Sequence, residues 1–237
     1  MTSDRSPIMD HLEELRRRLV KSAVAVTSGS VVAFLFHERL LAFLVEPYSQ
    51  VVGGEGLIFT QVTEAFSVAM RVSLLGGVIL SSPVLIYQVW AFISPALTPR
   101  ERRYALPLSG ILAVLFLSGV AFAYWSLPRA LEFLLTFGGE SVEAFITINN
   151  YLSFASRFLL VFGLSFEFPV FIFAAALAGM VDSAQLARGR RWAVLLIVII
   201  GAVITPSGDP LTLMVLSIPL YLLYEATIWA VRLVLRR

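Results

Sequence analysis

Six runs of apolar residues divide the chain, and their lengths constrain the fold more than any other feature. They lie near 19–36, 66–96, 105–127, 151–179, 191–205 and 211–231. A helix needs roughly 17–25 apolar residues to cross about 30 Å of hydrocarbon. The fifth run is short and the sixth begins a few residues after it, so we expect these two to form a tight helical hairpin.

The composition requires lipid as the solvent for these runs. Hydrophobic residues make up 58% of the 237 residues and charged residues 14%, against roughly 45–50% and 25% in soluble domains. We therefore predict an all-α integral membrane protein whose residues 1–237 form a single membrane domain with six transmembrane helices. Pro83, Pro169 and Pro219 interrupt three of the runs and predict kinked helices.

The basic residues predict the orientation, because Lys and Arg concentrate in cytoplasmic loops. One side of the predicted membrane receives Arg5, Arg16, Arg17, Arg18, Lys21, Arg100, Arg102, Arg103, Arg188, Arg190, Arg191, Arg232, Arg236 and Arg237. The opposite side has Arg39 and Arg129, and Arg71 and Arg157 fall near the outer ends of their spans. We expect both termini in the cytoplasm.

The segments 37–65 and 128–150 are then expected on the outer side. They carry several glutamates and are long enough to form caps of short helices. Apolar residues such as Leu40, Phe43 and Leu44 are expected to lie on the membrane surface, as in interfacial amphipathic helices.

Several classes of chemistry are excluded by what the sequence lacks. There are no cysteines, and the only histidines are His11 and His37, which excludes thiol catalysis, Cys-ligated metals and a poly-His site. No zinc-protease, serine-hydrolase or phosphate-loop motif occurs. We expect no cofactor, no metal and no enzyme activity, and the net charge of +2 gives no reason to expect nucleic acid.

Glu167 is the first candidate functional residue, because a charge at mid-bilayer costs about 2.5–3.5 kcal/mol even on the mildest scale. It lies inside the fourth run, two residues before Pro169. Two interpretations stay open. The carboxyl is either satisfied inside the bundle, with no functional role, or lines a hydrated concavity where it can engage a ligand.

The second candidate region is residues 11–19, HLEELRRRL, an amphipathic lead-in to the first span. Glu14 and Arg18 are spaced as an i, i+4 pair, and the simple interpretation is an orientation anchor. The two arginines before an apolar run are similar to a twin-arginine signal peptide, but no cleavage site follows, so we expect a retained first helix. The third region, 98–103, sets one acid, Glu101, among arginines.

Taken together, these regions resemble the TatC family, the multispan subunit of the twin-arginine protein translocase. The similarity rests on residues 11–19, on SPVLIYQVWAFISPAL at 82–97 followed by ERR at 101–103, on GLSFEFP at 163–169, on TPSGD at 205–209 and on residues 218–225. It covers essentially the whole chain in order. One departure is Leu213, where many family members carry a polar glutamine.

The resemblance implies recognition of twin-arginine signal peptides on folded cargo. Glu14 and Glu101 look like the acids that receive the signal's arginines, with Arg16, Arg18 and Phe92 beside them. A guanidinium is a fixed fork that matches a carboxylate in a bidentate way, which lysine cannot reproduce.

The resemblance also implies a concave six-helix bundle with Glu167 on its concave wall, in the cytoplasmic membrane of a prokaryote. The implied partners are single-span proteins of the TatA and TatB type, membrane lipid and further subunits of a larger complex, with the proton gradient driving transport. Docking of the single-span partners is expected near the last two spans, at Ala202, Val203, Ile204, Thr205 and Glu225.

Two other classes of protein remain as alternatives. A proton- or ion-coupled small-solute transporter would use Glu167 as a proton carrier, and internal pseudo-symmetry would favour it. The sequence shows no internal repeat. A purely structural membrane scaffold would leave the acids among the arginines at 11–19 and 98–103 unexplained.

Overall fold

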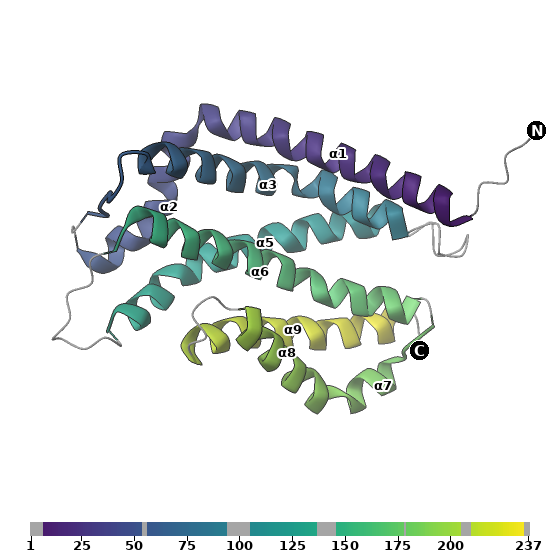
Figure 1. Cartoon of the computed structure of the whole chain (residues 1–237). Helices are drawn as coiled ribbons and strands as arrows, with labels where there is room; N and C mark the ends of the chain where they lie inside the picture. The colour runs from purple at the N-terminus through teal and green to yellow at the C-terminus, as the bar shows by residue number, and fades with distance from the viewer. Residues whose placement is uncertain are drawn as a thin grey trace, which may run out of the picture.

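The computed structural model of the chain describes residues 7–53, 56–93, 105–136, 146–177, 179–204 and 210–234. Apart from an isolated β-bridge between Ile58 and Thr147, its regular structure is helical over these residues (Figure 1). The helices are α1 (Pro7–Leu35), α2 (His37–Val52), α3 (Glu64–Ile93), α5 (Ala105–Thr136), α6 (Ile148–Leu177), α7 (Ser183–Arg188), α8 (Arg190–Ile204) and α9 (Pro210–Val234). The predicted all-α class is confirmed for the described chain.

Five of the described helices are long and apolar enough to cross a membrane, namely α1, α3, α5, α6 and α9. The helix over the short fifth run, α8, has 15 residues and is therefore about 22 Å long, less than the roughly 30 Å of a hydrocarbon core. The helix α5 continues through Pro128 to Thr136, past residue 127 where the third apolar run ends. The expected short cap helix at the start of 128–150 is thus the last part of α5.

Helices α1 and α3 run antiparallel in close contact (Figure 1). Ser81 Oγ donates to the Ala25 carbonyl at 2.7 Å, a bond from one helix to the other. A Cβ on Gly77 would overlap Ser30, so only a residue without a side chain fits there. Small residues and cross-helix hydrogen bonds are the usual means of association between membrane helices. This contact sets the start of α1 beside the end of α3.

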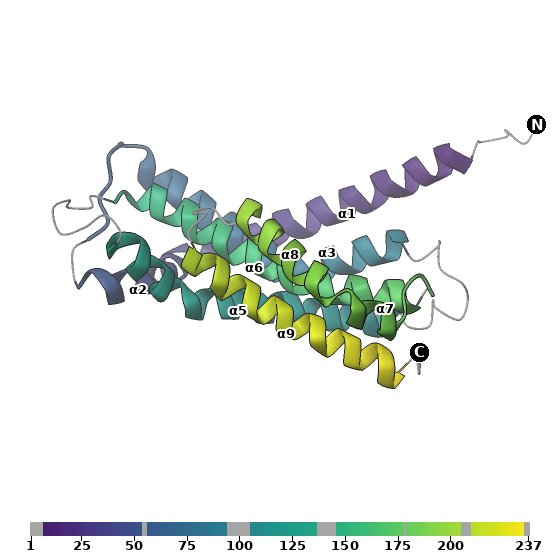
Figure 2. The same cartoon turned by 90° about the horizontal axis from the view of Figure 1, so that it is seen from below.

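The core follows α6, which packs against α5 and α9 (Figure 2). Its side chains Leu152, Phe158 and Phe162 are fully buried, and the rings of Phe158 and Phe162 are 4.5 Å apart. On the α5 side, a Cβ on Gly119 would lie 2.7 Å from the Phe162 carbonyl. A glycine is therefore needed at this contact between α5 and α6 as well.

The helix α2 packs inward, which corrects one prediction from the sequence. Leu44 is 5% exposed and belongs to the main hydrophobic core, and Leu40 packs against that core. Only Phe43 stays exposed, and its ring stacks on Tyr124 of α5. The apolar face of α2 packs on α3 and α5, and Tyr151 of α6 bonds the Leu44 carbonyl, so this face is not directed to the membrane surface.

The two ends of the bundle differ in charge (Figures 1 and 2). One end of the bundle, which we call the arginine-rich end, contains the starts of α1 and α8, the helix α7 and the ends of α3, α6 and α9. Its described arginines are Arg16, Arg17, Arg18, Arg188, Arg190, Arg191 and Arg232. The other end, which we call the α2 end, has Arg39 on α2, Arg71 in the first part of α3 and Arg129 near the end of α5.

Candidate functional site

An ion pair between Glu14 and Arg18 lies in α1 at the arginine-rich end. Arg18 donates from Nε at 3.0 Å and from Nη2 at 2.5 Å, both to Glu14 Oε1. The Glu14 side chain is 32% exposed and that of Arg18 is 22% exposed, so the i, i+4 pair expected from the sequence is confirmed. Such exposed pairs contribute only about 0.3–0.5 kcal/mol. Another guanidinium can therefore replace Arg18 at small cost.

One helical turn before Glu14, α1 contacts α3 through two rings. The imidazole of His11 stacks on Phe92 with ring centroids 4.5 Å apart. The structure thus brings Phe92 next to the N-terminal segment, with which the resemblance groups it. Arg16 is exposed on the same stretch of α1. Glu101, the second predicted acid, lies outside the described residues.

Glu167 lies in α6 and is 9% exposed. Gly163 and Val170, which share its helix face, pack on Phe116 of α5 and on the cluster around it. The Glu167 Oε1 atom has no hydrogen-bond partner among the described residues. A buried polar group without a partner costs about 1–3 kcal/mol, and more if charged. The described bundle therefore lacks the partner that the satisfied-carboxyl interpretation requires for this oxygen.

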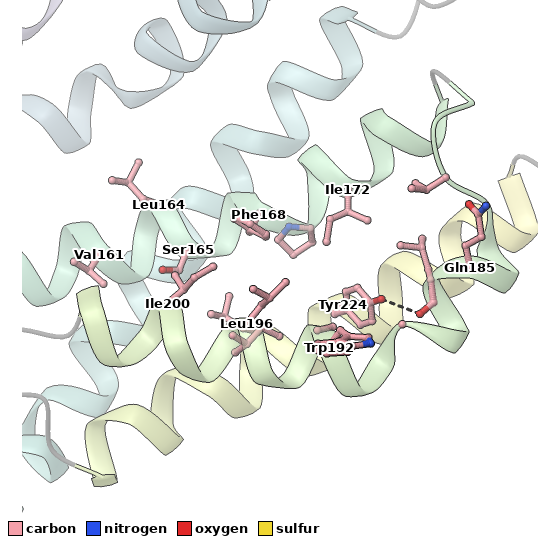
Figure 3. A pocket seen from close by; sticks show the side chains of 17 residues that line it. Val161, Leu164, Ser165, Phe168, Ile172, Gln185, Trp192, Leu196, Ile200 and Tyr224 are labelled. Carbon is pink, nitrogen blue, oxygen red and sulfur yellow. Dashed lines mark hydrogen bonds between the residues drawn. The ribbon is translucent and has the colours of Figure 1, made fainter.

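The opposite face of α6 borders an apolar cavity of about 610 Å³ (Figure 3). Its walls come from α6, from α7 and α8, and from α9, and they include Ser165, Trp192, Leu196 and Tyr224. The Tyr224 hydroxyl donates to the Leu186 carbonyl at 2.9 Å near the α7 end of the cavity. Glu167 does not line this cavity, so α6 separates the candidate carboxyl from the apolar chamber.

Glu225, predicted as a docking residue, is held by side chains of its own chain. Arg190 donates from Nε to Glu225 Oε1 at 2.5 Å and from Nη2 to Oε2 at 3.0 Å, and Tyr221 donates to Oε1 at 2.9 Å. This bidentate pair fastens the start of α8 to α9. Ala202, at the other end of α8, is exposed. The side chains of Val203 and Ile204, and all of Thr205, lie outside the described part of the chain.

Comparison with known proteins decides the family. Residues 10–219 match the model of the family described as Sec-independent protein translocase protein (TatC). The chain belongs to the TatC family. Similar relatives carry the name TatC. The protein from Aquifex aeolicus is 37% identical over 98% of this chain and 97% of its own length, and that from Carboxydothermus hydrogenoformans is 34% identical over 96% and 93%. The relative from Frankia casuarinae is 38% identical over 94% of this chain, which covers 65% of that protein.

Two solved structures agree with this assignment. Crystal structures of the twin-arginine translocase receptor TatC are 37% identical to this chain and cover 94% of it. Their TM-scores are 0.80, for the structure in the detergent DDM, and 0.77. The family predicted from residues 11–19, 82–97 and 163–169 is confirmed.

The sequence analysis missed a polar junction at the α2 end of this TatC protein. The Glu64 carboxylate accepts from the backbone N–H groups of Thr60 at 2.6 Å and Asn149 at 3.3 Å, and Arg71 donates to the Asn149 carbonyl at 3.1 Å. Arg71 also donates to Ser153 Oγ. The start of α6 is therefore fastened to α3 on both sides of Asn149. The sequence does show an acid, Glu64, in the first turn of an apolar helix, which could have marked it as a candidate. Nothing in the sequence indicates its partners, because they lie far away along the chain.

Proposed function

We propose that this chain is the receptor for twin-arginine signal peptides and a core subunit of a translocase that exports folded proteins. Its family consists of protein-transport components, not enzymes. The observation that carries the proposal is the Glu14 carboxylate at the arginine-rich end, which already holds a guanidinium at hydrogen-bond distance. The pair shows that this carboxylate accepts hydrogen bonds from a guanidinium, which supports the same role toward a signal arginine.

Binding then proceeds by exchange of guanidinium groups. A signal arginine replaces Arg18 at Glu14, and both charged groups keep a partner because Arg18 is partly exposed to solvent. The stacked pair of His11 and Phe92 offers an aromatic surface beside the exchanged arginine, and Arg16 is exposed nearby. Glu101 is the second proposed acceptor, on the resemblance alone.

The arginines and the apolar stretch of a signal peptide contribute differently to the binding free energy. A hydrogen bond to a charged group contributes about 1.5–3 kcal/mol net, so two carboxylates supply roughly 3–6 kcal/mol. Micromolar binding needs about 8 kcal/mol. The remainder comes from the apolar stretch of the signal lying against the membrane helices. The arginines therefore select the peptide and the apolar stretch retains it.

For Glu167 we propose a role after signal binding. Its buried Oε1 has no described partner, which favours a carboxyl reached by water on a concave wall of the bundle over one that is satisfied internally. Glu167→Ala should preserve signal binding and impair transport. Glu167→Gln, which keeps polarity and volume, should be milder. Normal transport by the Ala variant would remove this role.

We further propose six spans in the cytoplasmic membrane of a prokaryote, with α8 as the short fifth span and both termini in the cytoplasm. The charge difference between the two ends of the bundle supports this orientation. Because the chain has no cysteine, single cysteines report topology without background. Val62→Cys, at a fully exposed loop residue, should react with an impermeant thiol reagent in intact cells. Gln185→Cys on α7 should react only after lysis, and the reverse pattern would overturn the orientation.

The partners proposed for this chain are single-span proteins of the TatA and TatB type, docking near Ala202, Val203, Ile204 and Thr205, together with self-association in a larger complex. The exposed Ala202 and the short α8 support a docking face there. Glu225 acts from within, by fastening α8 to α9 through Arg190. Photocrosslinkers placed at Ala202 should capture such a partner, and capture of lipid alone would argue against this face.

Selective binding of twin-arginine peptides is the direct test of the receptor function. The purified chain is titrated with a labelled signal peptide and with the same peptide carrying Lys-Lys in place of Arg-Arg. We expect the Arg-Arg peptide to bind roughly tenfold tighter or more, since one charge-assisted bidentate contact is lost with lysine. Equal binding of the two peptides would contradict the proposal.

A further inference from the structure

The cavity behind α6 has a shape and a lining that suit a single flexible apolar chain. The helix α8 packs along α9, whereas the cavity lies between α8 and α6 over the length from Val161 to Gln185 (Figure 3). Its volume of about 610 Å³ is in the range of roughly 300–1,000 Å³ that holds small molecules.

The α7 end of the cavity differs in character from the end beside Val161, where Ser165 is the polar side chain in the described lining. Gln185 and Trp192 line the α7 end. The exposed arginines Arg188 and Arg191 do not line it but lie next in sequence to the lining residues Gly189 and Trp192. The guanidinium carbon of Arg191 lies 5.8 Å from the centre of the Trp192 ring. Arg188 donates to a backbone carbonyl, that of Ala184, at 3.3 Å.

These two arginines have no carboxylate partner among the described residues, in contrast to the arginine between them. Arg190 is neutralised by its bidentate pair with Glu225. Two positive charges without a described carboxylate partner therefore lie in the segment that forms the α7 end of the cavity, next in sequence to the lining residues Gly189 and Trp192. Basic pockets between membrane helices on the cytoplasmic side are typical binding sites for anionic lipid headgroups.

We propose that this cavity is a binding site for an anionic phospholipid from the leaflet on the arginine-rich side. One acyl chain occupies the cavity between α6 and α8, and the phosphate lies against Arg188 and Arg191, with Trp192 at the boundary between tail and headgroup. The acyl chain supplies the contact with α6 that α8, a short helix with one packed neighbour, otherwise lacks. The lipid is thus a structural component of the α8–α9 hairpin.

The test uses the full chain purified in detergent and native mass spectrometry. The protein is incubated with phosphatidylglycerol or phosphatidylcholine carrying identical acyl chains, and the retained lipid is measured. We expect retention of phosphatidylglycerol. The double variant Arg188→Gln, Arg191→Gln should lose roughly 30-fold in affinity, from about 1 kcal/mol per arginine near an anionic lipid surface.

Arg232→Gln is the matched control. Its guanidinium carbon lies 5.6 Å from the Trp229 ring, nearly as Arg191 lies from Trp192, but neither residue lines the cavity. This variant should bind phosphatidylglycerol like the unaltered chain. A loss equal to that of the double variant would mean a general charge effect and would overturn the site.

Occlusion tests the acyl-chain part of the proposal. Ser165→Phe fills the cavity from the α6 wall, and Ala193→Phe fills it from the α8 wall if the first variant does not fold. Each should abolish retention while circular dichroism shows unchanged helix content. Equal retention of both lipids by the unaltered chain, or full retention by a folded occluded variant, would overturn the proposal. So would crosslinking of a signal peptide at residue 165 in protein that retains no phosphatidylglycerol, since the cavity would then belong to the peptide.

Discussion

The two ends of the bundle use their polar side chains in different ways. At the α2 end, hydrogen bonds join helices far apart in sequence, as when the Tyr151 hydroxyl of α6 donates to the Leu44 carbonyl of α2 at 2.5 Å, 107 residues away. At the arginine-rich end, the ion pair of Glu14 with Arg18 stays within α1, whereas the pair of Arg190 with Glu225 joins α8 to α9. The Tyr151 bond is buried, whereas Glu14 and Arg18 are partly exposed.

The buried bond of Tyr151 with Leu44 therefore belongs to a fixed part of the bundle, and the exposed pair of Glu14 with Arg18 to a site where one arginine can replace another. Breaking a buried bond leaves a group without a partner, so the α2 end resists rearrangement. Replacing one exposed guanidinium by another costs little because water and the incoming group both substitute for the old contact. The buried bond that joins α6 to α2 therefore lies at the opposite end of the bundle from Glu14, where we propose that the peptide binds.

The largest expected effect is on peptide binding through Glu14. Glu14→Gln removes the charge but keeps the size of the side chain, so a signal arginine loses about 1.5–3 kcal/mol of interaction. Affinity for a twin-arginine peptide should fall roughly 10- to 150-fold by fluorescence titration. Thermal unfolding in detergent should hardly change, because only an exposed i, i+4 pair is lost. Unchanged affinity would remove the exchange site from α1.

The next largest effect is expected at the α2 end, where a substitution should lower stability and leave peptide affinity unchanged. Tyr151→Phe removes a buried hydroxyl and its hydrogen bond to the Leu44 carbonyl, which should lower the free energy of unfolding by about 1–1.5 kcal/mol. Peptide affinity should stay the same. Chemical unfolding followed by tryptophan fluorescence measures the first quantity, and titration measures the second.

The matched control for Tyr151→Phe is Tyr124→Phe. Tyr124 donates to the neighbouring carbonyl, that of Phe43, at 2.9 Å, but this bond is exposed to solvent. Its loss should cost less, about 0.5–1 kcal/mol. If the two variants were equally stable, burial would not be what makes the α2 end rigid. If Tyr151→Phe weakened peptide binding, the two ends would be coupled.

The smallest expected effect comes from Arg18. In the free protein Arg18 occupies Glu14 Oε1, so an incoming arginine competes with it. Arg18→Gln should tighten peptide binding by about twofold, the equivalent of the roughly 0.3–0.5 kcal/mol of an exposed pair. A tenfold loss would instead mean that Arg18 contacts the peptide directly, and it would sharpen the site by adding a residue to it.

The sequence predicted correctly what depends on local pattern. Apolar runs of sufficient length specify membrane helices wherever they fall, because the backbone must satisfy its own hydrogen bonds in lipid. The Glu14–Arg18 pair followed from helical spacing alone. Motifs such as residues 82–97 were specific enough to indicate the family that the comparison established.

Contacts between distant segments were decided only by the tertiary structure. The prediction for Leu44 was the membrane surface, because an amphipathic face does not specify what covers it. Packing of α2 on α3 and α5, with Tyr151 of α6 bonded to the Leu44 carbonyl, buries Leu44 instead. Glu64 and Arg71 meet at Asn149, more than 75 residues from either of them, only because α3 and α6 begin at the same end of the bundle. The cavity between α6 and α8 likewise depends on how far apart two helices pack, and helical periodicity carries no information about that distance.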